Sequence, residues 1–77
     1  MTDREKEWAS RATRFIKAEV KRAGIGYREL AVRLNEHGLQ ETEDSIASKL
    51  ARGTFAATFL LAVVQVLELE GLTLTDL

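Results

Sequence analysis

Glycine divides the sequence into four segments, and each segment repeats its apolar residues at the three- and four-residue spacing of a helix. The glycines that end these segments are Gly24, Gly38, Gly53 and Gly71. An apolar stripe at this spacing gives a helix one face to bury, and glycine readily adopts the left-handed conformation that ends many helices. Because the chain contains no proline to interrupt the segments, the pattern predicts a small all-α fold of four to five helices.

The first segment predicts a long helix that ends at Gly24. Its apolar stripe consists of Trp8, Ala12, Phe15, Ile16, Val20 and Ala23. Glu19 falls within this stripe, so we expect its carboxylate either to reach the rim of the core or to pair with a cation there, because a buried charge without a partner is costly. Lys49 and Arg52 are the candidate partners.

A second helix is expected over the stretch GYRELAVRLNEHG, with Gly26 as its N-cap and Gly38 as a left-handed C-terminal cap. Its buried stripe consists of Tyr27, Leu30, Ala31 and Leu34. A third helix is expected over residues 43–52, because Thr42 is a favourable N-cap and the first turn carries acidic residues that suit the positive end of the helix dipole. The small residues expected where these two helices cross are Ala31 and Ala47.

The fourth segment predicts a helix from Phe55 to about Glu70, capped by Thr54. It is apolar on nearly all sides and is therefore expected at the centre of the fold. The stretch TLTDL after Gly71 is expected to add one further turn. One stripe of the helix can be covered by the first three helices, and it consists of Phe55, Phe59, Ala62, Val63 and Val66.

A second apolar surface continues around the other sides of the fourth helix. It consists of Leu60, Leu61, Val64 and Leu67. This surface predicts a homodimer, because a monomer rarely exposes a contiguous patch of this kind and a two-fold pairing would bury it. The alternative is that the segment around Trp8 and the C-terminal stretch LTLTDL cover the same surface within one chain.

Composition bounds the function as well. The 77 residues suffice for one small domain, expected to span residues 1–77. There is no cysteine and a single histidine, His37, so we expect no disulfide, no cysteine or histidine metal site, no cofactor and no enzymatic activity. The charged N-terminus lacks the pattern of a signal peptide, and the apolar run 55–67 is shorter than the roughly 20 residues of a membrane-spanning helix. Both features favour a cytoplasmic protein.

Charge is distributed unevenly along the chain. Residues 1–35 carry nine basic and five acidic side chains, whereas residues 36–77 carry two basic and seven acidic ones, so the net charge of −1 hides a basic first half. Part of this positive charge forms one face of the first helix, made of Arg11, Arg14, Lys17 and Lys21. We interpret this face as solvated, with an acidic protein or nonspecific nucleic acid as the alternative partners.

The stretches IGYRELAVRLN and DSIASKLARGTF, followed by a long apolar helix, resemble the helix-turn-helix domain of phage repressors and Cro, the lambda-repressor-like family. The resemblance covers roughly residues 16–77. The stretches GYRELAVRLNEHG and KLARGTF also look like an uncharacterised bacterial family of short single-domain proteins. The first resemblance implies a regulator of transcription that binds double-stranded DNA with the helix 43–52. The residues expected at the DNA are Tyr27, Arg28, Ser45, Ser48, Lys49, Arg52 and Thr54.

Acidic residues at the start of the third helix support a different interpretation. Glu41, Glu43 and Asp44 lie where the helix would approach the duplex, and a carboxylate that faces phosphate weakens DNA binding. The alternative function is a protein-interaction module, such as an adaptor or inhibitor, that keeps the fold without binding DNA. In that case Lys49 and Arg52 would complement the C-terminal end of the helix dipole or pair with Glu19.

Overall fold

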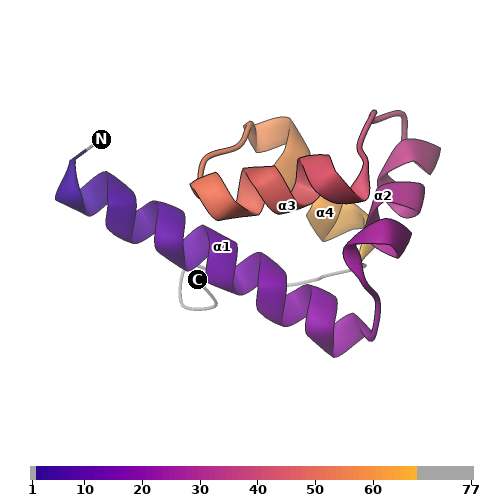
Figure 1. Ribbon diagram of the computed structural model, residues 1–77, viewed down its shortest axis with the longest axis horizontal. Coiled ribbons are helices and arrows are strands. Elements are labelled where there is room, and N and C mark those ends of the chain that lie inside the picture. Colours follow the sequence, from indigo (N-terminus) through magenta and orange to yellow (C-terminus); the bar gives the residue numbers. More distant parts are fainter. Residues whose placement is uncertain (1, 68–77) are drawn as a thin grey trace.

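The computed structural model describes residues 2–67, and over this range the protein consists of α-helices without a β-strand (Figure 1). The helices are α1 (Asp3–Ala23), α2 (Tyr27–Glu36), α3 (Glu43–Arg52) and α4 (Ala57–Val66). α1 is the longest and runs alongside α3, while α2 and α4 contact each other at the other end of the fold. The prediction of an all-α fold is confirmed for the described residues.

Helix α1 begins at the N-cap Thr2, whose hydroxyl accepts a hydrogen bond from the amide of Glu5 at 3.1 Å. It ends at Gly24, which has a φ of 73°. Only the middle and C-terminal turns are buried, through Phe15, Ile16 and Val20. The predicted apolar stripe is therefore too long at both ends, since Trp8 and Ala23 are exposed.

Helices α2 and α3 have the predicted starts and ends to within two residues. Gly26 is the N-cap of α2, and Gly38 follows its end with a φ of 92°. α3 starts with a capping box, in which the side chains of Thr42 and Ser45 each bond to the backbone of the other residue. It ends at Gly53, which has a φ of 72°. Local capping chemistry therefore sets both limits of α3 and the C-terminal limit of α2, whose start has no side-chain cap.

Helix α4 begins at Ala57, two residues later than predicted, with Ala56 rather than Thr54 as its N-cap. Phe55 stays in the preceding loop and packs there against Phe59, with a distance of 5.3 Å between the ring centroids. The helix ends at Val66 instead of near residue 70. The predicted turn TLTDL lies outside the described residues.

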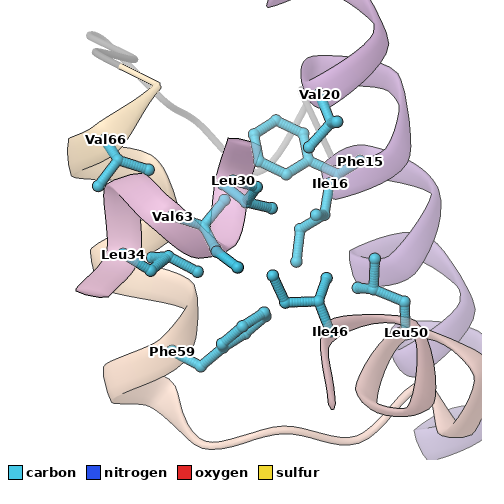
Figure 2. Close-up of a cluster of buried hydrophobic side chains, with 11 residues drawn as sticks. Phe15, Ile16, Val20, Leu30, Leu34, Ile46, Leu50, Phe59, Val63 and Val66 are labelled. Atoms are coloured by element: carbon cyan, nitrogen blue, oxygen red, sulfur yellow. The ribbon is translucent and has the colours of Figure 1, made fainter. Parts of the chain in front are cut away.

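The hydrophobic core receives side chains from all four helices, and Figure 2 shows them pointing toward one another. The largest fully buried side chains are Ile16, Leu30, Leu34, Ile46 and Val63. α4 contributes Phe59, Val63 and Val66, the inner members of its predicted stripe. Ala31 is buried as expected at a helix crossing, but Ala47 is exposed, because α3 turns Ile46 and Leu50 toward the core and Ala47 away from it.

Candidate nucleic-acid interface

The connection between α2 and α3 is held by a pair of hydrogen bonds from one side chain. The Asn35 amide nitrogen donates to the carbonyl oxygen of Glu41 at 3.0 Å, and the Glu41 amide donates to the Asn35 side-chain oxygen at 2.8 Å. Asn35 lies in the last turn of α2, and Glu41 directly precedes the N-cap of α3. These bonds fix the start of α3 relative to the end of α2.

The Glu41 side chain is 7% exposed and is the acceptor at the centre of a polar cluster. Lys49 Nζ lies 2.8 Å from Glu41 Oε1 and 2.6 Å from Oε2, and the Ser45 hydroxyl donates to Oε1 at 2.7 Å. Lys49 Nζ also lies 5.2 Å from the centroid of the Phe59 ring, within reach of a cation–π interaction. Two of the residues expected at DNA, Ser45 and Lys49, therefore bond within the domain.

This cluster also corrects the expected partner of Glu19. Glu19 does lie at the rim of the core, with its side chain 11% exposed, but its cation is Arg22 on the same helix, at 2.8 Å. Lys49 and Arg52 were the predicted partners. Lys49 is bound to Glu41 instead, because the turn before α3 brings that carboxylate next to it. An i,i+3 partner on the same helix needs no tertiary contact to come within reach of Glu19.

One face of α3 is left uncovered by the rest of the described chain. Its members follow helical spacing, and all are exposed: Asp44, Ala47, Ser48, Ala51 and Arg52. We call this stripe the α3 face. It contains two of the residues expected at DNA, Ser48 and Arg52, and the exposed Thr54 follows it in the next loop. Three of the five side chains on this face are small, so α3 presents a nearly smooth surface with an arginine at its end.

The other two expected DNA residues, Tyr27 and Arg28, start α2. The Arg28 side chain is 89% exposed, and its Nε lies 3.9 Å from Glu43 Oε2. Tyr27 is half-buried and packs against the core. Arg28 pairs with Glu43 and Lys49 pairs with Glu41, so two of the three acidic residues at the start of α3 have a cation beside them. The third, Asp44, forms no ion pair with any residue between 2 and 67.

A groove lies between residues 6–17 of α1 and the C-terminal end of α3. We call it the α1/α3 groove, and its volume is about 440 Å³. Its polar lining consists of Lys6, Ser10, Thr13, Arg14, Lys17 and Arg52, so it contains four cations and no carboxylate. The Thr13 hydroxyl donates to the Leu50 carbonyl oxygen at 3.2 Å and links the two walls.

Gly53 allows the walls of this groove to come together. A Cβ atom at this position would lie 3.3 Å from Ala9 Cβ, and the residue has a positive φ. Sequence reasoning placed Arg14 and Lys17 on a solvated face and did not connect them with Arg52. The tertiary contact between α1 and α3 brings these residues together. The spacing of residues along the sequence does not predict this contact.

The surface predicted to mediate a homodimer is only partly open in the described chain. Leu61 is 67% exposed, whereas Leu60, Val64 and Leu67 are half-buried, and Leu60 and Leu67 pack against the core. Trp8, which was the alternative cover for this surface, is 49% exposed and stacks with Arg11, whose guanidinium carbon lies 4.9 Å from the ring centroid.

Within residues 2–67, four helices around one hydrophobic core define a small all-α domain. The chain belongs to the family described as a domain of unknown function (DUF6471), whose model matches residues 8–72. No curated protein and no solved structure matches the chain significantly. Over residues 2–67, none of the helices has both the length and the apolar composition that crossing a membrane requires, and no three acidic or histidine side chains lie together as metal ligands would.

Proposed function

We propose that this domain binds double-stranded DNA as a repressor-like regulator of transcription, with α2 and α3 as its helix-turn-helix and the α3 face at the duplex. The observation that carries the proposal is the exposed stripe of small side chains on α3. The major groove of B-DNA admits an α-helix, and short side chains let the helix approach the base edges closely. Ser48 offers one hydroxyl donor and acceptor there, and Arg52 offers the fork geometry that suits guanine or phosphate.

The internal ion pairs support this proposal, because they reduce the negative charge that α3 would bring to the phosphates. Glu41 is bound to Lys49 and its side chain is only 7% exposed, and Glu43 lies near Arg28. Asp44 remains the acid on the α3 face with no ion-pair partner among residues 2–67. The fixed connection at Asn35 also holds α3 rigidly, which suits a helix that must enter a groove in one orientation.

Ser48→Glu tests the contact directly. It adds one negative charge at the centre of the α3 face and keeps a good helix former, so the fold is expected to survive. We expect affinity for a fluorescein-labelled duplex of 20 base pairs, measured by anisotropy, to fall by at least roughly tenfold, because the new carboxylate faces phosphate. Gln65→Glu is the matched control, since Gln65 is an exposed residue of α4 and this variant has the same net charge as Ser48→Glu.

Two results would contradict the proposal. Equal loss of affinity in both variants would mean that net charge alone governs binding, and the α3 face would lose its assignment. A wild-type protein that binds no duplex even at low salt would rule out DNA binding altogether, because phosphate contacts are strongest there. The protein-interaction module would then be the function to pursue.

Self-association is the second part of the proposed function, and the exposure of Leu61 favours it. A dimer would place two copies of α3 for paired half-sites on DNA. We expect wild-type protein at micromolar concentration to sediment as a dimer and Leu61→Lys to sediment as a monomer, because a charge at the interface must lose its water. Val32→Lys is the control, since Val32 is 47% exposed on α2. A wild-type monomer, or a dimer that Leu61→Lys leaves intact, would contradict this interface.

A further inference from the structure

The cations of the α1/α3 groove differ from most other cations in residues 2–67 in forming no ion pair with a carboxylate of that range. Four arginines outside the groove each pair with an acid, and they are Arg11, Arg22, Arg28 and Arg33. Within the groove, Lys6, Arg14, Lys17 and Arg52 are all exposed, and no residue between 2 and 67 forms an ion pair with them. Four such charges around one concavity create a local positive potential that an anion would neutralise.

We propose that the α1/α3 groove binds the phosphodiester backbone of duplex DNA beside the site where α3 docks. This inference rests on the proposed function and extends it to a surface that the helix-turn-helix resemblance does not assign. Arg52 connects the two surfaces, because it ends the α3 face and also lines the groove. A duplex that lies against α3 therefore brings a strand of phosphates toward α1.

The chemistry of the groove selects the sugar-phosphate backbone rather than exposed bases. Its cations are accompanied by two hydroxyls, Ser10 and Thr13, and Thr13 already donates to Leu50. The residues that line it include no aromatic ring, whereas proteins that bind single strands use aromatic rings to stack bases. Lysines that reach phosphates add affinity to every sequence equally and do not read the bases.

The salt dependence of duplex binding tests this assignment. Each phosphate contact contributes a slope of about −0.9 to the logarithm of the binding constant against the logarithm of salt concentration. We expect Lys17→Gln to flatten the slope for a 20-base-pair duplex by about one unit, and Lys6→Gln with Lys17→Gln by about two. Lys21→Gln is the matched control. Lys21 is exposed one turn further along α1, outside the groove, and we expect the Lys21→Gln variant to keep the salt-dependence slope of the wild type.

The outcomes separate this inference from the proposed function. If the wild type binds duplex and Ser48→Glu weakens it, but Lys17→Gln and Lys21→Gln leave the same slope, then α3 contacts DNA and the groove does not. If the wild type binds no duplex, the proposed function fails first. Equal affinity of the wild type for a single strand of the same length would also overturn the inference, because the groove would then not be selecting a duplex. Circular dichroism of each variant confirms that the helices are kept.

Discussion

Lys49→Met is expected to lower the free energy of unfolding by about 3 kcal/mol, because removing one partner of a partly buried ion pair leaves the other, more deeply placed charge without compensation. The charge that remains is the Glu41 carboxylate, whose side chain is 7% exposed. The effect belongs at the lower end of the range for such pairs, since Lys49 is itself 26% exposed and Ser45 still donates to the carboxylate. Urea unfolding followed by circular dichroism measures the loss.

Arg33→Met provides the matched comparison. Arg33 also pairs with a carboxylate, that of Glu29 at 3.3 Å, but both side chains of this pair are well exposed. Its loss is expected to cost less than about 1 kcal/mol. If Glu41→Leu is added to Lys49→Met, the double variant should recover much of the stability, because no unpaired charge is then buried. A cost for Lys49→Met no greater than that for Arg33→Met would show that the pair does not hold α3 to its connection.

Leu34→Ala is expected to have an effect of similar size for a different reason. The side chain is 0% exposed in the core between helices, so the substitution loses burial and leaves a cavity, at a cost of about 2–5 kcal/mol. Small domains are stable by only about 5–15 kcal/mol, so a substantial part of the total stability is lost. Thermal and urea unfolding both report this change.

Leu61→Ala is the control for the core substitution, since it makes the same chemical change at a side chain that is 67% exposed. We expect a change within about 0.5 kcal/mol when the measurement is made at a concentration where the chain is monomeric. Comparable losses for the two leucines would mean that Leu61 is buried in solution, either by a partner copy or within the chain.

The limits of α2 and α3 could be predicted from the sequence because they depend on neighbouring residues. Thr42 caps α3 by a bond to a residue three positions away, and Gly53 ends it by its own backbone conformation. The residues of the core could be predicted for the same reason, since helical spacing alone places Leu30 and Leu34 on one face. Such signals act within one or two helical turns, so they can be recognised in the sequence before the tertiary structure is known.

The polar cluster, the groove and the start of α4 depend on how segments of the chain pack together, which local sequence patterns do not specify. Glu41 reaches Lys49 because of the way the connection enters α3, where Asn35 holds the Glu41 backbone, and Arg52 joins Lys17 because α1 and α3 lie together. The start of α4 was predicted too early for a related reason. Phe55 looks like the first residue of an apolar helix, but it lies in the loop before α4 and packs there against Phe59.

The length of α1 has a consequence for how the domain responds to a ligand. The first twelve residues of this helix include no buried side chain. These turns contact the rest of the domain through the Thr13–Leu50 hydrogen bond and the close approach of Ala9 to Gly53, and the cap at Thr2 and the Glu7–Arg11 pair support them locally. Isolated helical turns of this length are marginally stable in water. One wall of the groove is thus the part of α1 with the fewest contacts to the core, and such segments open at a lower free energy than the rest of a fold. A polyanion bound there would shift that local equilibrium toward the helix, so residues that never touch the ligand would tune its affinity through their helix propensity.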